Sequence, residues 1–250
     1  MKPLNKLKMI RARKRLSIIQ SAYIPWKGFF DLVNRCDEYV ILDSVQFSKG
    51  HWHNRNRIKT DRGPAWITIP VETAGRLEQR IQDVTIAGPW SEQHWHALER
   101  NYRGATFFPT LSTTVRQWYE LAGREKRLTA INELFLLRII ELLGIRTKIT
   151  RDETYQPQGA RDDRVLDICL KAGATNYLSG PSARAYIDEG KFRRAGILVE
   201  WMTYSGYPEY PQLWGTFEHH VSILDMLFNA GPSAPNWSGL SSRGDEAGPA

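Results

Sequence analysis

Cationic and amide side chains alternate along residues 51–59. The cationic or titratable groups share one parity: His51, His53, Arg55, Arg57 and Lys59. Alternate residues of a strand point to opposite faces, so this spacing predicts a strand with these groups on one face. Because arginine binds phosphate in a bidentate manner, we expect Arg55, Arg57 and Lys59 to hold a di- or triphosphate or a sugar-nucleotide pyrophosphate. A solvated hairpin face is the structural alternative.

The other parity of this segment carries two amides, Asn54 and Asn56. If this second face is buried, both side chains need hydrogen-bond partners. The run Asn54-Arg55-Asn56-Arg57 would be an unusual composition for a hairpin strand whose only role is solubility. We therefore include Asn54 and Asn56 among the candidate substrate-binding residues.

Two residues are candidates for acid–base chemistry, Asp43 and His53. A histidine with its ordinary pKa near ~6.5 is suited to taking a proton from an amine or a hydroxyl. Asp43 ends the apolar run 38–43, where it could act as a general base, orient a sugar hydroxyl or hold a metal. The alternative is that Asp43 only caps a turn.

The segment 20–31 follows an apolar run and precedes a helical one, with Pro25 and Gly28 between them. Ligands of open α/β sheets bind at the carboxyl ends of strands, and amides at a helix start can receive an anion. The candidate binding side chains at this rim are Gln20, Tyr23, Trp26, Lys27 and, after the next strand, Gln46. Alternatively, the aromatic residues of the segment close one end of a core.

Two later segments supply further candidates. Ser179 and Gly180 stand in a small-residue turn between a short strand and a helix, where hydroxyls and amides can meet a phosphate. Tyr210 and Gln212 belong to the aromatic loop 204–214, which suits stacking on a sugar ring or a base. A loop that merely covers the core is the alternative, and its lack of Lys and Arg disfavours a single-stranded RNA platform.

The histidines do not predict a metal centre. His-Trp-His occurs at 51–53 and 94–96, but no cysteine or carboxylate cluster completes a ligand set at the usual spacing. His219 and His220 are expected within the last helix. The phosphate-loop, dinucleotide-binding and nucleophile-elbow motifs are absent, which argues against the corresponding enzyme classes. We expect neither a metal nor a cofactor.

The elements that position these residues alternate between short apolar strands and helices. Strands are predicted over 16–20, 38–43, 145–150, 176–178 and 197–204, helices over 29–35, 92–102, 127–143, 164–172, 182–189 and 217–229, and a hairpin over 50–71. This order predicts an α/β fold with a mainly parallel sheet flanked by helices and a β-hairpin insertion near the N-terminus.

Length and composition set the domain organisation. The 250 residues are 42% hydrophobic and 11% aromatic, enough for a sizeable core. The net charge is +7, and residues 1–15 carry seven basic residues and no acid, so the remainder is neutral. We expect a basic disordered tail over 1–15, one domain over 16–230 and a disordered Gly/Pro/Ser-rich tail over 231–250. Nucleic-acid binding is then restricted to the first tail.

Neither a secretory signal nor a run long enough to cross a bilayer is evident, and we expect a cytoplasmic protein without a membrane span. The two cysteines, Cys36 and Cys169, are accordingly expected to be reduced packing residues.

Several blocks, in this order, resemble the WbqC family. They cover about 16–231, and the matching stretches are Gln20-Ser21 with Tyr23 to Asp31, Asp43 with Val45-Gln46-Phe47, Trp52 with Asn54 to Lys59, Trp66 with Thr68 to Val71, Tyr177 to Gly180, Tyr210-Pro211-Gln212, and Leu224 to Asn229 with Gly231. Many family members have His-Gln-Pro where this chain has Ile19-Gln20-Ser21. A catalytic histidine at that position is therefore not general to this protein.

The family is associated with bacterial O-antigen and other surface-polysaccharide biosynthesis, and the resemblance implies a transferase acting on activated sugars. We expect it to move a small acyl or aminoacyl-type group onto a nucleotide-linked sugar. Its partners would be the sugar nucleotide and an activated donor or carrier protein. The alternatives are a non-catalytic sugar-nucleotide or carrier-binding module and a nucleotidyl-transferring enzyme.

Overall fold

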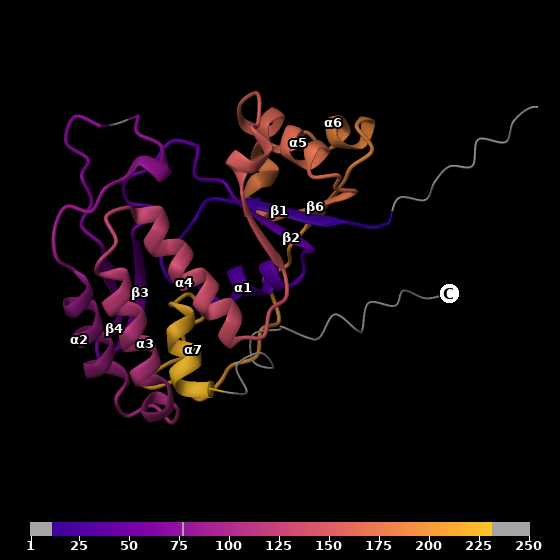
Figure 1. The fold of residues 1–250 in the computed structure, drawn as a ribbon. Helices are drawn as coiled ribbons and strands as arrows, with labels where there is room; N and C mark the ends of the chain where they lie inside the picture. Colours follow the sequence, from indigo (N-terminus) through magenta and orange to yellow (C-terminus); the bar gives the residue numbers. More distant parts are fainter. Residues whose placement is uncertain (1–11, 77, 232–250) are drawn as a thin grey trace, which may run out of the picture.

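A computed structural model describes residues 12–76 and 78–231 of the chain (Figure 1). Most of the two expected tails, 1–11 and 232–250, lies outside the described residues. The fold begins before residue 16, because Lys14 Nζ donates to the Ala172 carbonyl at 2.6 Å and lies 2.8 Å from Glu38 Oε2. Arg15 is already the first residue of a strand.

Within the described residues, the main sheet has five parallel strands in the order β5-β2-β1-β6-β7. Their bounds are β1 (Arg15–Ile19), β2 (Glu38–Ile41), β5 (Lys148–Arg151), β6 (Asn176–Ser179) and β7 (Leu198–Trp201). The chain moves outward from β1 to β2 and β5, and then returns to the opposite side of β1 for β6 and β7. The strand order therefore reverses between β1 and β6.

Helices cover both faces of this sheet, as the sequence predicted. Their bounds are α1 (Lys27–Asn34), α2 (Ser91–Tyr102), α3 (Phe108–Ala122), α4 (Leu128–Leu142), α5 (Arg161–Lys171), α6 (Glu189–Arg194) and α7 (Ile223–Ala230). On one face, Ile18 and Val40 pack with Ile168 of α5 and Phe192 of α6. The opposite face packs with α1, and Figure 1 shows α5 and α6 beside β1 and β6.

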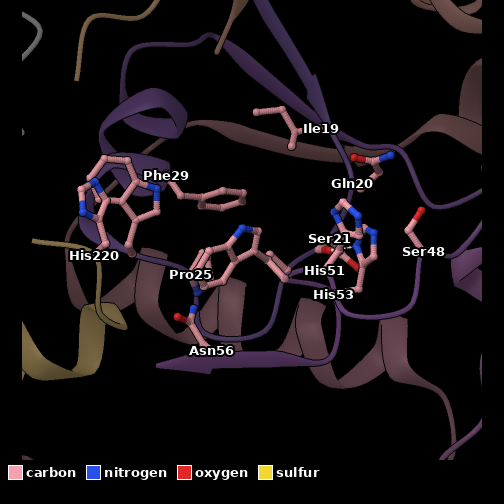
Figure 2. Close-up of a pocket in the computed structure, with 13 residues that line it drawn as sticks. Ile19, Gln20, Ser21, Pro25, Phe29, Ser48, His51, His53, Asn56 and His220 are labelled. Atoms are coloured by element: carbon pink, nitrogen blue, oxygen red, sulfur yellow. Dashed lines mark hydrogen bonds between the residues drawn. The ribbon is translucent and has the colours of Figure 1, made fainter. Parts of the chain in front are cut away.

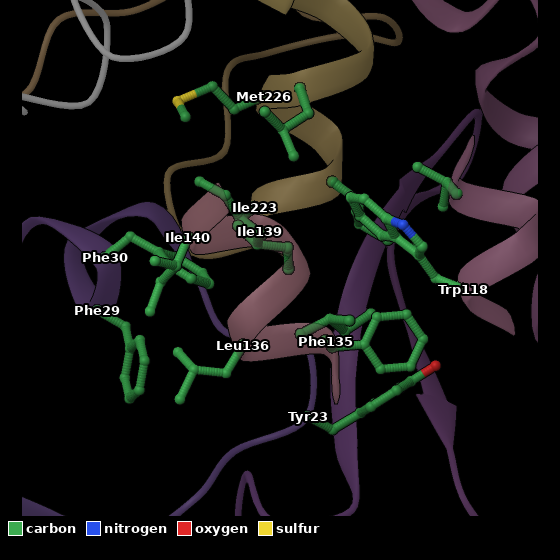
Figure 3. Packing of buried hydrophobic residues seen from close by; sticks show 14 of the residues in the cluster. Tyr23, Phe29, Phe30, Trp118, Phe135, Leu136, Ile139, Ile140, Ile223 and Met226 are labelled. Atoms are coloured by element: carbon green, nitrogen blue, oxygen red, sulfur yellow. The ribbon is translucent and has the colours of Figure 1, made fainter. Parts of the chain in front are cut away.

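A second layer, made of α2, α3, α4 and α7, lies beside the sheet and shares its larger core (Figure 1). The apolar spacing of α4 places Phe135 and Ile139 inside, where both are fully buried. Figure 3 shows these residues between Phe30 of α1, Trp118 of α3 and the α7 side chains. This packing holds the loop after β1 against a rigid helical body.

The β-hairpin consists of β3 (Arg55–Thr60) and β4 (Gly63–Thr68), paired in the register Arg57 with Trp66. The predicted strand over 51–59 is wrong in its first half, because residues 51–54 form a turn. His51 and His53 therefore do not continue the face of Arg55 and Arg57. The turn occurs where Trp52 accepts a backbone hydrogen bond from Tyr23 rather than from a strand partner.

The predicted bounds of two other helices also differ from the structure. The helix predicted over 182–189 is a 3-10 turn, Pro181–Ala185, followed by α6, because Asp188 caps a new helix through Lys191 N–H. The helix predicted from 217 begins only at Ile223, so His219 and His220 lie in the preceding loop. Helix α3 lies in a stretch without a predicted element and carries Pro109 in its first turn, where proline is tolerated.

Both cysteines are buried and neither is in a disulfide, and Cys36 Sγ lies 3.2 Å from the Leu32 carbonyl. Burial raises the pKa of the Cys169 thiol. Within residues 12–76 and 78–231, none of the helices combines the length and apolar character needed to cross a bilayer.

Candidate functional site

A pocket of about 520 Å³ opens immediately beyond the carboxyl end of β1. Its walls come from the loop after β1, the start of α1, the turn before β3 and the loop before α7. The lining residues are Ile19, Gln20, Ser21, Ala22, Pro25, Trp26, Phe29, Ser48, His51, Trp52, His53, Asn56 and His220. We call this the histidine pocket. None of its lining residues is Lys, Arg, Asp or Glu.

The position of the histidine pocket follows from the sheet topology. The strand order reverses between β1 and β6, and connections leaving the two strands run to opposite faces, which opens a crevice at their carboxyl ends. The loop that leaves β1 at Ile19 lines this crevice. Figure 2 shows His51 and His53 gathered near Ser21, Gln20 and Ser48, with Phe29 and His220 on the other side.

Ser21 is the centre of the hydrogen bonds that fix this loop. Its amide donates to Asp43 Oδ1 at 2.9 Å, and its carbonyl lies 3.0 Å from His53 Nδ1. Its hydroxyl accepts from Asn132 Nδ2 at 3.0 Å, and the same amide nitrogen donates to the His53 carbonyl. These hydrogen bonds do not use the hydroxyl hydrogen of Ser21, which lines the pocket.

Above its lowered pKa, His53 is a neutral imidazole with one nitrogen unused. A carbonyl oxygen can only accept, so the Nδ1 atom facing Ser21 carries the hydrogen and Nε2 holds a lone pair. Burial lowers the pKa of His53, against smaller opposing effects of the Ser21 carbonyl and the Asp43 charge. Nε2 has no hydrogen-bond partner among the described residues, and it is not sealed from solvent. The pocket thus presents a lone pair suited to accepting a proton.

Trp26 forms the aromatic wall opposite these histidines. Its ring centroid lies 5.2 Å from Tyr204 and 5.1 Å from His220. The neighbouring Gly28 makes room for it, because a Cβ at that position would lie 2.4 Å from the Trp26 ring. The Pro-Trp-Lys-Gly sequence therefore has a packing reason that local turn rules did not reveal.

The loop after β1 also contains a strained residue, Ile24, whose φ is +37°. A residue with a β-branched side chain rarely adopts such a φ, so the surroundings must hold this backbone conformation. Asn56 Nδ2 donates to the carbonyls of Tyr23 and Ile24 at 3.0 and 2.8 Å.

The two asparagines of the hairpin segment are both buried. Asn56 lines the pocket, and the side-chain amide of Asn54 donates to the Ile69 carbonyl at 2.8 Å. Both asparagines thus have the partners that burial required.

Arg55 and Arg57 lie beside the pocket rim and are not among its lining residues. Arg55 donates to the Gly50 carbonyl, next to His51, and its guanidinium lies 4.2 Å from the Trp66 ring. Arg57 donates through Nε and Nη2 to the His220 carbonyl at 3.2 and 2.8 Å. The two arginines therefore brace the two loops that carry His51 and His220.

Four of the predicted binding residues lie together elsewhere, around a buried carboxylate, Asp225 of α7. We call this the Asp225 cluster, and its members are Lys27, Lys59, Tyr102, Tyr210, Gln212 and Asp225. Tyr210 and Gln212 donate to Asp225 Oδ1 at 2.6 and 2.7 Å, and Tyr102 donates to Oδ2 at 2.9 Å.

The two lysines of the Asp225 cluster are buried. Lys59 donates to Gln212 Oε1 and to the Thr216 carbonyl. Lys27 lies among the rings of Tyr207, Tyr210 and Phe217, with its Nζ atom 5.0–5.5 Å from their centroids. Burial lowers the pKa of Lys27 to about 8, although the Asp225 charge opposes this effect. These cations face internal partners and are closed to a phosphate.

The remaining candidates are spread around the fold. Asp43 lines a smaller pocket of about 240 Å³ with Arg151 and Asp152, and Thr129 donates to its Oδ2. Tyr23 is fully buried, with its hydroxyl 2.9 Å from both His94 Nδ1 and Tyr119 Oη.

Gln46 is exposed, and its backbone bridges to Arg80. Ser179 is buried and its Oγ accepts from the Tyr177 hydroxyl at 3.2 Å, while Gly180 approaches Tyr204. Ser179 and Gly180 are absent from the lining of the histidine pocket.

Of the predicted substrate-binding side chains, Gln20, Trp26 and Asn56 therefore line the histidine pocket, together with His53 from the catalytic pair. Sequence reasoning had not selected Ser48, Trp52 or His220 for this site. The sequence placed His51 on the predicted cationic face and weighed it as a metal ligand, and it placed His220 in the last helix. The adjacent pair His51-Trp52 was a usable signal, whereas His220 has no such neighbour. In the described part of the chain, no three His, Cys, Asp or Glu side chains form a metal-binding group.

Comparisons with known proteins agree with the sequence blocks. A family model described as the WbqC-like protein family matches residues 20–236. The uncharacterized protein Rv1507c of Mycobacterium tuberculosis (strain ATCC 25618 / H37Rv) is 44% identical over 225 residues, which cover 90% of this chain and 97% of that protein. No solved structure matches the chain. The matched range includes every residue of the histidine pocket except Ile19, and the chain belongs to the WbqC-like protein family.

Proposed function

We propose that the histidine pocket is the active site of a transferase that moves a small acyl or aminoacyl-type group onto a nucleotide-linked sugar. The observation that carries this proposal is the state of His53. It is neutral, fixed through Nδ1 to the Ser21 carbonyl, and has an unused Nε2 beside a cavity of about 520 Å³. That arrangement is the one a general base requires.

The pocket composition supports a sugar as the acceptor. Trp26 offers flat apolar surface, while Gln20, Ser48 and His51 offer hydrogen-bonding groups around the cavity. Sugar rings have apolar faces and hydroxyl edges, and such a mixed lining matches both. The absence of charged side chains from the lining fits a neutral ring better than a phosphate.

In the proposed reaction, the acceptor amine or hydroxyl attacks the carbonyl carbon of an activated acyl donor. His53 Nε2 takes the proton of the attacking group as the new bond forms. When the bond to the donor's leaving group breaks, His53 returns this proton to the leaving group. The Ser21 hydroxyl, held by Asn132, is placed to donate to the oxygen that becomes negative.

Asp43 acts in this proposal as a positioning residue. Its carboxylate accepts hydrogen bonds from the Ser21 amide and the Thr129 hydroxyl, on the side of the loop away from the histidine pocket. It holds the Ser21 peptide whose carbonyl orients His53, and its charge favours the protonated imidazole that forms during transfer.

The test is turnover of a panel of nucleotide sugars with acyl-thioester donors, followed by mass spectrometry. His53→Asn should lower the rate by about 10²- to 10⁴-fold, with the affinity for the sugar nucleotide retained. His96→Asn, at an exposed position of α2, is the matched control and should keep the wild-type rate.

The pH profile adds a second readout. Because burial lowers the pKa of His53 below its ordinary value of 6.5, more than half of the base is unprotonated at pH 6.5. The wild-type rate should therefore reach its plateau at a lower pH than a solvent-exposed histidine would give, and should fall as the pH decreases below the lowered pKa. Binding of nucleotide sugars without any product would instead identify a non-catalytic binding module, and an undiminished rate in His53→Asn would refute the assignment of the base.

A further inference from the structure

Two half-exposed tryptophans stand at the mouth of the histidine pocket, Trp52 and Trp66. Each is 47% exposed, and their ring centroids lie 5.2 Å apart with an angle of 38° between the planes. Trp52 lines the pocket itself, whereas Trp66 belongs to β4 of the hairpin. Large indole rings left open to water in adjacent positions are a common mark of a binding surface.

A cation extends this pair of rings. The Arg55 guanidinium carbon lies 4.2 Å from the Trp66 ring, and that of Arg57 lies 6.0 Å from the same ring. The hairpin register explains the grouping, because Arg57 pairs directly with Trp66 and Arg55 is two residues away on the same face. Trp52, Trp66, Arg55 and Arg57 thus form a continuous row beside the pocket, which we call the tryptophan–arginine row.

The two arginines retain unused hydrogen-bond donors. Arg55 uses Nη2 for the Gly50 carbonyl, and Arg57 uses Nε and Nη2 for the His220 carbonyl. Neither Nη1 group has a protein partner among the described residues. One carboxylate, Glu218 Oε1, lies 3.9 Å from Arg57 Nη2. Each guanidinium group therefore has a donor available for a ligand, beside a pocket whose lining has no Lys, Arg, Asp or Glu.

We propose that the tryptophan–arginine row binds the nucleoside diphosphate part of the substrate, with the base on Trp52 and the diphosphate against Arg55 and Arg57. This inference rests on the proposed function, since it places the sugar of the same molecule in the histidine pocket. Indole rings stack on any base, and arginine suits phosphate oxygens. The pocket lining has aromatic rings but no Lys or Arg. The row supplies the cationic groups that the pocket lacks.

The test is isothermal titration calorimetry with the diphosphates of uridine, thymidine, cytidine and guanosine, and with the corresponding free nucleosides. We expect at least one diphosphate to bind the full-length protein. Trp52→Ala should weaken both the diphosphate and its nucleoside by about 10- to 100-fold. Arg55→Gln should weaken only the diphosphate, because its contact is with phosphate.

Two matched controls exclude general effects of these substitutions. Trp214→Ala removes another exposed tryptophan, 41% exposed and far along the sequence, and Arg62→Gln removes a charge from the hairpin turn. Both should keep the wild-type affinity. Thermal unfolding of every variant checks that the fold is intact, which is expected because the substituted side chains are partly exposed.

The possible outcomes separate this inference from the proposed function. If nucleotide sugars are turned over with His53 dependence but Trp52→Ala and Arg55→Gln keep wild-type affinity, the row is not the nucleotide site and the function stands. If none of the four diphosphates binds and no nucleotide sugar is turned over, both proposals fail. If a diphosphate binds with the expected losses but no product forms, the row is supported and the catalytic function is not.

Discussion

The histidine pocket and the Asp225 cluster contrast sharply, although both contain residues that the sequence marked as functional. The pocket is open, has a volume of about 520 Å³ and is lined by uncharged and histidine side chains. The Asp225 cluster has two lysines and a carboxylate, and all three are buried. Gln212 hydrogen-bonds to Lys59 and to Asp225, whereas Lys27 Nζ donates a long hydrogen bond, 3.4 Å to the Pro208 carbonyl. The cluster is thus charged and closed, and the pocket is uncharged and open.

This difference has a physical origin. A buried charge must be paired and hydrogen-bonded, so nearby polar groups are drawn to it and none is left for a ligand. His53 is neutral and costs less to hold in a partly buried position with one nitrogen unpaired. The proposed active site is accordingly marked by an unused polar atom beside a cavity and not by density of charge.

The largest expected effect on stability comes from Asp225→Ala, which removes the carboxylate at the centre of the Asp225 cluster. The change leaves the Tyr102 and Tyr210 hydroxyls without their acceptor and removes the negative charge near Lys27 and Lys59. Because uncompensated buried charges are strongly destabilising, the free energy of unfolding should fall by about 3–5 kcal/mol. Urea unfolding followed by circular dichroism measures this loss.

The control for that variant is Glu120→Ala, which removes an exposed carboxylate paired with Arg116 on α3. An exposed pair of this kind contributes about 0.3–0.5 kcal/mol. If Asp225→Ala left the unfolding free energy close to that of the control while abolishing substrate binding, the Asp225 cluster would have to be regarded as part of the site.

A second prediction sharpens the comparison through a closed histidine, His94. Its Nε2 lies 3.2 Å from the Thr68 carbonyl and its Nδ1 lies 2.9 Å from the Tyr23 hydroxyl. Burial lowers the pKa of His94 to about 4, against 6.5 in the unfolded chain. Its contribution to stability is thus complete above pH 6.5 and is lost as the pH falls from 6.5 to 4.

At about 1.4 kcal/mol per unit, this loss amounts to about 3 kcal/mol in total. Urea unfolding at a series of pH values should show that His94→Gln loses less stability over this range than the wild type does. Parallel curves for the two proteins would mean that protonation of His94 is not coupled to unfolding.

The smallest effect is expected from Gly28→Ala, which changes the shape of the open region. The added Cβ would lie 2.4 Å from the Trp26 ring and would push this wall of the histidine pocket aside. We expect sugar-nucleotide affinity to fall about tenfold and the unfolding free energy to fall by about 1–3 kcal/mol.

Gly88→Ala is the matched control for this change, because a Cβ there meets no atom within 4 Å. It should leave both affinity and stability unchanged. Calorimetry with the sugar nucleotide and urea unfolding give the two quantities, and wild-type affinity in Gly28→Ala would show that Trp26 does not shape the binding surface.

The sequence predicted the α/β class, the parallel sheet and the hairpin, because apolar runs and helical spacing report burial directly. The helix expected over 127–143 is α4, and the strand expected over 176–178 is β6. The helix predicted from residue 217 was wrong over 217–222, which form a loop before α7 begins at Ile223. It also extended the hairpin strand back over His51 and His53, since alternation continues there without a strand partner.

Composition and spacing by themselves determined that this chain has an α/β core and that the loop after β1 combines turn residues with polar groups. They also predicted Asp43 and His53 as candidate bases, a prediction that remains to be tested. Only the tertiary structure decided which candidates share a cavity. Whether Lys59 or Trp52 reaches solvent depends on loops more than 100 residues away or on a turn that no local pattern encodes, because burial is a property of packed neighbours and not of a residue's own sequence.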